Sequence, residues 1–450
     1  MIHNSVFRAY DIRGIYPDEI NEKTAYQIGF AFAAYLKEFE ISRPEKVVVG
    51  RDARLSSPVL FHSFVRGITD NGINVWDIGL STVDEAYFAS GYFHLPAAII
   101  TASHNPKNWN GFKLMKSNVE FFPIEDLQKI INSSAQENAA IFKKGKITSE
   151  NIKTDYLKHV LDFINVESIR PMRVAIDASN GVAGPMLEAV LKKLPISYAA
   201  LNFSPDGDFP AHEPDPTQEK NLTNLKNEVI ASHYHFGCAL DGDGDRIIFV
   251  DENGESTPSS VTGALMSKYF LSGTRSEKVV YSTTMSKIIP EIIQMYNGEA
   301  VIEKVGHAFI SRRLKEIEGV LGVEKSGHYF FKKNFYADSG IISFLIMLQI
   351  LSNEKKSLSV LASKFRKYFS TPEINFKIEN PEILIKKIAQ NFEGYEINWL
   401  DGLTVTTSDF WLNVRPSNTE PLLRLNIEAK DEIVLNRVKK DIASLIKKYL

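Results

Sequence analysis

Short apolar runs of strand length recur along the 450-residue chain, and each of them leads into a polar loop. Amphipathic stretches of helix length lie between the runs. Because parallel strands need a crossover connection, usually a helix, this alternation predicts α/β domains with mixed, largely parallel sheets. The runs are KVVVGRD (46–52), AAIITASH (97–104), RVAIDASNG (173–181), CALDGDGD (238–245) and VVYSTT (279–284), and the helical stretches are 24–39, 58–70, 184–194 and 306–317.

The pattern changes near residue 371. Closely spaced strand-like segments surround WLDGLTVTT (399–407), and helical periodicity precedes and follows them at 381–392 and 431–450. Such a strand-rich segment between helices predicts a separate α+β domain. A chain of this length also exceeds what one hydrophobic core usually supports. We therefore expect boundaries near residues 150, 253 and 370.

The composition restricts the partners of the chain. Hydrophobic residues make up 44% and charged residues 24%, and the formal net charge is -3. This balance gives no general attraction to nucleic acid or to an anionic membrane, so any anion site must be local. The N-terminus lacks the features of a secretory signal, and the longest apolar stretch, 340–351, is too short to span a bilayer. The only cysteine, Cys238, is predicted to be a small buried hydrophobe. We expect a cytoplasmic enzyme with neither a nucleic-acid nor a membrane partner.

Ser103, in TASHNP (101–106), follows an apolar run and precedes an Asn-Pro turn. Open α/β sheets bind ligands beyond the carboxyl ends of their strands, so this hydroxyl is a candidate functional group. The alternative is that Ser103 only ends a strand at a turn and has no chemical role. A serine hydrolase is disfavoured, because Ser103 lacks the G-x-S-x-G elbow.

The string DGDGDR (241–246) places Asp241, Asp243 and Asp245 on alternate positions, separated by glycines. The backbone can curl there and direct three carboxylates to one spot, which suits Mg²⁺. An EF-hand does not fit, because Arg246 replaces the required glycine and IIFV (247–250) resembles a strand. A plain hairpin turn is disfavoured too, since crowded carboxylates are costly without a cation.

Two further strings carry polar groups suited to phosphosugars. In RPSNTEPLLR (415–424), an arginine, hydroxyls, an amide and turn amides supply the parts of a phosphate site, although a surface turn is the alternative. In EKSGH (324–328), Glu324 and Ser326 can bond sugar hydroxyls, and His328 can contact substrate or move a proton; a helix cap or loop is the alternative. Lys113 in NGFK (110–113) is a candidate general acid/base, although a lone lysine is usually a surface charge.

The strings TASHNP, DGDGDR, EKSGH and RPSNTEPLLR, in their order along the chain, resemble the signature of the α-D-phosphohexomutases, a family that includes phosphomannomutase/phosphoglucomutase and phosphoglucosamine mutase. FRAYDIRG (7–14), GRDARLSSP (50–58), FPAHEPDP (209–216) and DGLTV (401–405) extend the resemblance over nearly the whole chain. It implies three α/β domains and a C-terminal α+β domain around a central cleft. The implied domains are residues 1–150 with the phosphoserine loop, 151–253 with the metal-binding loop, 254–370 with the sugar-recognition loop, and 371–450 with the phosphate-binding site.

The resemblance also implies a reaction. A phosphoryl group on Ser103 would pass reversibly between the enzyme and a hexose 1- or 6-phosphate, through a hexose 1,6-bisphosphate, with mannose or glucose as the sugar. Mg²⁺ would be held by Ser103, Asp241, Asp243 and Asp245. The other implied catalytic residues are Lys113, His104 and Arg13, and the implied substrate-binding residues are Tyr10, Arg246, His307, Glu324, Ser326, His328, Arg415, Ser417, Asn418, Thr419 and Arg424.

The chain departs from the family at two positions that bear on sugar contacts. Thr284 stands where bifunctional members often carry a lysine, with Lys287 nearby, and Val323 stands where many have glycine. Phosphoglucosamine mutase is the nearest alternative function, and a Mg²⁺-dependent sugar-phosphate phosphatase would use the same carboxylates. A non-catalytic phosphosugar-binding protein would be expected to lack Ser103 or the aspartates. The sequence leaves the chain as a monomer or a homodimer.

Overall fold

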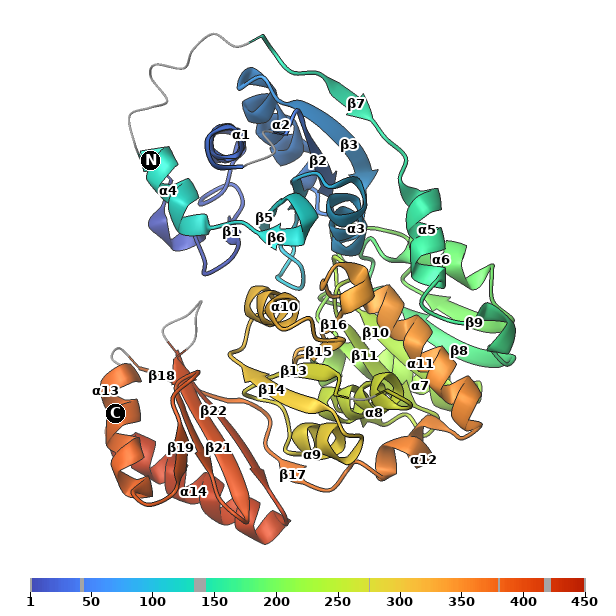
Figure 1. The fold of residues 1–450 in the computed structure, drawn as a ribbon, viewed down its shortest axis with the longest axis vertical. Coiled ribbons are helices and arrows are strands. Elements are labelled where there is room, and N and C mark those ends of the chain that lie inside the picture. The colour runs from blue at the N-terminus through green and yellow to red at the C-terminus, as the bar shows by residue number, and fades with distance from the viewer. Residues whose placement is uncertain are drawn as a thin grey trace. The chain divides into compact units, whose positions relative to one another are not determined.

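The computed structural model describes residues 2–40, 44–132, 143–274, 276–378, 381–416 and 422–448. Their strands form four sheets that follow one another along the chain (Figure 1). Contacts divide the chain into two compact units. Unit 1 comprises Met1–Thr257 and Ser326–Ser359, and unit 2 comprises Pro258–Lys325 and Val360–Leu450.

The first sheet is mixed. Its central strands β2, β3 and β4 run parallel, whereas β5 runs antiparallel to both β4 and β1. The helices α1 and α2 pack on it through buried aromatic side chains such as Phe32 and Phe64. In sheet order the strands are β1 (Ile12–Ile15), β5 (Trp109–Lys116), β4 (Ala97–Ile100), β2 (Lys46–Arg51), β3 (Asn74–Leu80) and β7 (Ile147–Ser149), with β6 (Glu120–Phe121) on β5, and the helices are α1 (Glu22–Phe39), α2 (Ser57–Asp70), α3 (Val83–Phe93) and α4 (Ile124–Asn132).

The second sheet joins three parallel strands to an antiparallel hairpin. The turn of this hairpin, between β10 and β11, contains DGDGDR. Because β12 pairs with β11, the second sheet extends to Thr257, beyond the boundary predicted at 253. In sheet order the strands are β12 (Ser256–Thr257), β11 (Ile247–Asp251), β10 (Phe236–Leu240), β8 (Met172–Asp177) and β9 (Ile196–Leu201), and the helices are α5 (Lys153–Leu161), α6 (Gly184–Leu191), α7 (Thr223–Ala231) and α11 (Gly340–Glu354).

The strands of the third α/β segment that belong to unit 2 are parallel. Its unit 2 strands are β14 (Glu299–Glu303), β13 (Lys278–Ser282) and β15 (Leu321–Val323), and the helices of this part of the chain are α8 (Ser259–Leu271), α9 (Ile288–Met295), α10 (His307–Glu316) and α12 (Leu358–Ser363). The strand β16 (Tyr329–Phe331) belongs to unit 1.

The fourth sheet is antiparallel throughout, and α13 and α14 lie against it (Figure 1). Leu384 and Ile442, one from each helix, join its apolar core. The strands are β17 (Phe369–Ser370), β22 (Leu422–Ala429), β21 (Phe410–Pro416), β20 (Leu403–Thr406) and β19 (Glu396–Asn398), with β18 (Ile374–Lys377) on β22, and the helices are α13 (Pro381–Ala389) and α14 (Glu432–Lys448). Short 3-10 helices complete the described chain: η1 (Asn4–Val6), η2 (Ser117–Val119), η4 (Val166–Ser168), η5 (Glu219–Leu222), η6 (Lys332–Asn334) and η7 (Gln390–Phe392).

The fold class predicted from the sequence is confirmed: three α/β segments are followed by an α+β domain. The apolar stretch at 340–351 forms most of α11, which is buried on every side over Gly340–Ser352. No helix in the described ranges is long and apolar enough to cross a membrane. Cys238 is a buried free thiol, as expected, and its burial raises the pKa well above the usual range.

Candidate active site

Ser103 lies two residues after Thr101, just beyond the carboxyl end of the fully buried strand β4. Its backbone is left-handed, with φ 51°, a conformation that costs a non-glycine residue free energy and is common at functional sites. The Ser103 amide donates to Thr101 Oγ1 at 2.8 Å. Its hydroxyl donates to Asp241 Oδ2 at 2.7 Å and lies 3.2 Å from His104 Nδ1. The loop therefore directs the hydroxyl at the aspartate hairpin.

Arg54 holds this loop in place. The side chain is fully buried, and its guanidinium uses all five N–H donors. One donates to Asp52, and the other four donate to backbone carbonyls of the loop, those of Ser103, Asn105, Pro106 and Trp109, at 2.7–3.1 Å. Arg54 lies within GRDARLSSP, but its role could not be predicted from the sequence, because its partners are backbone atoms distant in the chain.

The aspartate hairpin concentrates three buried carboxylates. Asp241, Asp243 and Asp245 are each 0% exposed, and one oxygen from each lies within 4.8 Å of the others. Asp241 Oδ1 accepts from the amides of Gly244 and Arg246, which curls the turn. Asp243 Oδ1 is buried and has no hydrogen-bond partner among the described residues. Such a group of oxygens is suited to a hard divalent cation.

The hairpin glycines allow this geometry. Gly244 has φ +87°, which favours glycine. A Cβ on Gly242 would lie 2.6 Å from the carbonyl oxygen of Ser103, so only glycine lets the two loops approach this closely.

Lys113 supplies positive charge to the same hairpin. It lies on β5 opposite Ile99 of β4, and only 5% of it is exposed. Its Nζ lies 2.9 Å from Asp243 Oδ2 and 2.6 Å from Asp245 Oδ2. Burial lowers the pKa of Lys113, but the two carboxylates outweigh it, so the net shift is upward. Lys113 is therefore a buried ammonium ion that retains its proton.

The pKa values of Asp241 and Asp245 are shifted in opposite directions. Burial and the charges of Asp245 and Asp243 raise the pKa of Asp241 well above its usual range. Burial also acts to raise the pKa of Asp245, but Lys113 and His328 outweigh it and hold that pKa well below the usual range.

Arg13 and His104 complete the environment of Ser103. Arg13 Nη1 donates to Asn105 Oδ1 at 2.8 Å, and Arg13 pairs with Asp11 at 2.8 Å. Burial acts to lower the pKa of Arg13, but the charges of Asp11 and Asp243, with smaller contributions, together outweigh it and the net shift is upward. Burial and the positive charges of Arg246 and Arg13 hold the pKa of His104 well below its usual range, so this imidazole is neutral. Tyr10 is partly buried in the bend before β1.

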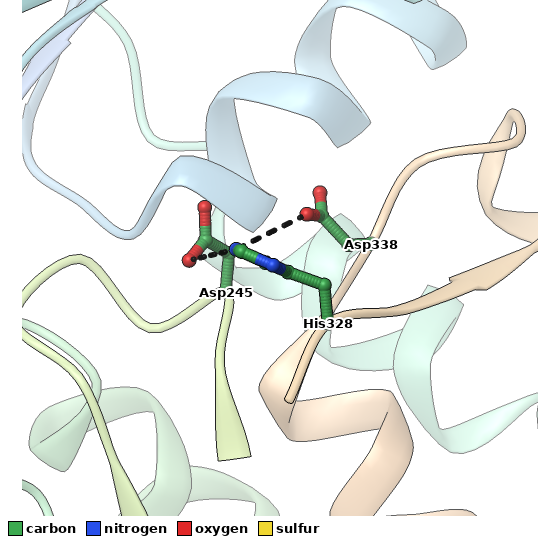
Figure 2. A group of neighbouring side chains, drawn as sticks. All are labelled: Asp245, His328 and Asp338. Atoms are coloured by element: carbon green, nitrogen blue, oxygen red, sulfur yellow. Dashed lines mark ion pairs between the residues drawn. The ribbon is translucent and has the colours of Figure 1, made fainter. Parts of the chain in front are cut away.

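His328 lies beside the metal loop. Figure 2 shows its ring between two carboxylates: Nε2 lies 3.3 Å from Asp245 Oδ1 and 3.8 Å from Asp338 Oδ2. Arg246 Nε donates to His328 Nε2 at 3.2 Å, and His328 Nδ1 lies 2.8 Å from Ser326 Oγ.

Asp338 was not predicted from the sequence. It is 0% exposed, and burial together with the charge of Asp245 raises its pKa to about 7. The available signal was an acidic residue two positions before the largely apolar α11, where a buried charge needs a partner.

Unit 2 contains the remaining predicted residues. Glu324 accepts from the amide of Gly306 at 2.9 Å, and the next residue, His307, begins α10 and is 5% exposed. Lys287 donates to the carbonyl of Thr407 at 2.7 Å, while Thr284 is buried. Lys287, which lies near the position where bifunctional family members often carry a lysine, is thus hydrogen-bonded to the backbone of the C-terminal domain.

Arg415 and Arg424 lie directly opposite each other on β21 and β22. Both pair with Glu373, at 3.5 Å and 3.1 Å. Ser417, Asn418 and Thr419 lie outside the described residues. Unit 1 thus brings together the predicted phosphoserine, metal and acid/base residues with Arg246, Ser326 and His328. Unit 2 carries Glu324, His307 and the arginine pair.

Comparison with known families covers nearly the whole chain. Four families, all described as phosphoglucomutase/phosphomannomutase, match in order: alpha/beta/alpha domain I over residues 4–140, domain II over 154–254, domain III over 258–368 and the C-terminal domain over 373–445.

Individual proteins agree with the family match. A phosphomannomutase of Methanocaldococcus jannaschii is 35% identical over 98% of both chains. A phosphomannomutase of Escherichia coli is 31% identical over 95% of this chain and 96% of its own length. The crystal structure of a phosphoglucomutase/phosphomannomutase family protein from Burkholderia thailandensis is 30% identical, covers 100% of this chain and 98% of its own, and superposes with a TM-score of 0.90. The chain therefore belongs to the phosphoglucomutase/phosphomannomutase family and is an isomerase of the phosphohexomutase type.

Proposed function

We propose that the protein interconverts the 1- and 6-phosphates of mannose and glucose through a phosphoserine at Ser103 and a hexose 1,6-bisphosphate intermediate. One observation carries the assignment of Ser103. Its hydroxyl, on a left-handed residue at the end of a buried strand, lies 2.7 Å from one of three clustered aspartates. A phosphoryl group on that oxygen would lie beside a cation-binding set of carboxylates.

The donor set fits Mg²⁺. Asp241, Asp243, Asp245 and the phosphorylated Ser103 would hold the ion. The ion would also provide a partner for Asp243 Oδ1, which is buried and has no hydrogen bond among the described residues. When bound, the cation supplies positive charge that polarises the phosphorus. Aspergillus fumigatus N-acetylphosphoglucosamine mutase, which shares the fold at 12% identity, was solved with GlcNAc-6P and magnesium (TM-score 0.63), and a serine-to-alanine variant of it was solved with glucose 1,6-bisphosphate (TM-score 0.60).

The side chains around Ser103 account for the proton balance. In the first half-reaction the P–Oγ bond of Ser103 breaks, a P–O bond to a substrate hydroxyl forms, and the hydroxyl proton must reach Ser103 Oγ. The neutral imidazole of His104, 3.2 Å from Oγ, can accept that proton and pass it to Oγ. Lys113, the other predicted acid/base residue, is an ammonium ion whose contacts with Asp243 and Asp245 hold its proton. The second half-reaction reverses these steps with the other phosphate.

The non-reacting phosphate needs a separate site. We assign it to Arg415 and Arg424 of unit 2, together with the predicted Ser417, Asn418 and Thr419, because paired guanidiniums bind phosphate oxygens through charge-assisted hydrogen bonds. The same arginines would hold the 1-phosphate in one half-reaction and the 6-phosphate in the other. Glu324, Ser326 and His328 would contact the sugar.

Initial rates test this function. Purified protein with Mg²⁺ and a trace of the matching bisphosphate should convert mannose 1-phosphate and glucose 1-phosphate to the 6-phosphates. Ser103→Ala should remain folded and inactive, whereas Ser63→Ala, on α2 of the same domain, should be active. Faster conversion of glucosamine 1-phosphate would contradict the sugar assignment. Sustained release of inorganic phosphate would identify a phosphatase instead.

A further inference from the structure

Unit 2 places three cationic side chains together. Arg415 and Arg424 of the C-terminal domain occupy directly opposed positions on the antiparallel strands β21 and β22. Lys325, from the domain before it, donates through Nζ to Oδ1 of Asn426 at 2.6 Å, and Asn426 lies two positions beyond Arg424 on the same face of β22. Like charges that face each other across strands are destabilising, so this cluster requires an anion.

Glu373 is that anion in the structure. Its carboxylate lies 3.1 Å from Arg424 Nη1 and 3.5 Å from Arg415 Nη2, and it accepts from Asn426 Nδ2 at 3.2 Å. The chain fixes this position, because β18 begins at the next residue and pairs with β22, with Ile374 opposite Leu425. The Glu373 side chain is 28% exposed, so solvent, and therefore a ligand, can reach it.

Arg415 and Arg424 share the carboxylate of Glu373, and Lys325 also lies within electrostatic range of Glu428. A phosphate monoester carries about two negative charges near neutral pH, so it can replace a single carboxylate between two guanidiniums. Arg415 Nε is buried without a hydrogen-bond partner among the residues described, so donor capacity also remains. The carboxylate of Glu373 occupies guanidinium N–H groups that a phosphate would use.

We propose that Glu373 is a positioning residue that also acts as an internal competitor of the substrate's phosphate. It orients Arg415 and Arg424 before substrate arrives, and its charge weakens phosphate binding. This inference rests on the proposed function, which assigns the non-reacting phosphate to the arginine pair. A mutase must release that phosphate in order to rebind the bisphosphate in the opposite orientation, so binding that is too tight would slow turnover.

The Glu373→Gln variant of the full-length protein tests the inference, because it keeps the length and an acceptor oxygen but removes the charge. A partly exposed ion pair contributes up to about 1 kcal/mol, which corresponds to about five-fold in affinity. We expect the KM for mannose 1-phosphate and the inhibition constant of inorganic phosphate to fall about five-fold each, and kcat to fall because release slows. Glu382→Gln, an exposed glutamate on α13, removes the same charge elsewhere and should change neither constant.

A purely structural role for Glu373 predicts the opposite sign. If Gln disorders the arginines, both constants rise, and that result would overturn the inference. Unchanged constants would overturn it too. Should Glu373→Gln not fold, Glu373→Met removes the charge at similar length, with the same expectations. Arg415→Lys separates the failure of this inference from the failure of the proposed function. If Arg415→Lys leaves the KM and the inhibition constant unchanged, the assignment of the phosphate site is wrong. If Arg415→Lys raises both constants and Glu373→Gln changes neither, only the competitor role of Glu373 is rejected.

Discussion

Replacing Arg54 with lysine should release the phosphoserine loop. The guanidinium satisfies four loop carbonyls and one oxygen of Asp52, and lysine has only three N–H donors. At least two buried acceptors therefore lose their partner, at about 1–3 kcal/mol each, so the loop should lose about 2–6 kcal/mol of local stability. The left-handed Ser103 would then relax toward ordinary backbone, which should also lower kcat.

Hydrogen exchange measures this loss directly, since a protein of several domains has no single free energy of unfolding. A loss of about 2 kcal/mol corresponds to about thirty-fold faster exchange, so protected amides within 101–110 should exchange at least about thirty-fold faster in Arg54→Lys. Arg66→Lys, an exposed arginine on α2 that lies over the ring of Tyr26, should leave these amides unchanged. Wild-type exchange at 101–110 in a folded Arg54→Lys protein would refute the reasoning.

Three further outcomes follow from the site. Asp243→Asn removes a charged candidate ligand, so activity should fall severely and the Mg²⁺ concentration for half-maximal rate should rise; full activity after exhaustive chelation would exclude a metal role. Arg415→Lys keeps the charge but loses the planar fork, so it should raise the KM for both hexose monophosphates and increase escape of the bisphosphate; an effect on only one monophosphate would reject a shared phosphate site. Burial lowers the pKa of His212, but the hydrogen bonds to Asp177 and to the Glu213 carbonyl, together with the charge of Asp177, outweigh it and the net shift is upward. The His212–Asp177 pair therefore contributes its full stabilisation at pH values below about 6.5, the pKa of histidine in the unfolded chain, and this stabilisation is lost as pH rises through the higher pKa of the folded state. His212→Gln should remove this pH dependence from the thermal stability measured between about pH 6 and 8.

The fold was predictable because its signals are local. Apolar runs such as 97–100 and 236–240 became β4 and β10, and the polar residues after them became the loops that carry Ser103 and the three aspartates. The alternation of Asp and Gly in 241–245 likewise predicted convergent carboxylates, which the hairpin provides.

Several residues that shape the site were not predictable from the sequence. Arg54 acts through backbone carbonyls about fifty residues away, and Asp338 meets His328 through the packing of distant segments. Glu373 precedes a short strand, and only the pairing of that strand with β22 reveals its contact with two arginines. The burial of Lys113 could not be predicted either, because a lone lysine in a sequence gives no sign of the two carboxylates in the β10–β11 turn that it contacts.

The central claim is that Ser103 carries the transferred phosphoryl group. Intact-protein mass and peptide mapping test it most directly, first after treatment with glucose 1,6-bisphosphate and again after addition of a hexose 6-phosphate as the acceptor. We expect one phosphoryl group, located on Ser103, that disappears when the hexose phosphate is added and reappears as bisphosphate. An active protein that never carries this group, or that carries it on another residue, would contradict the account.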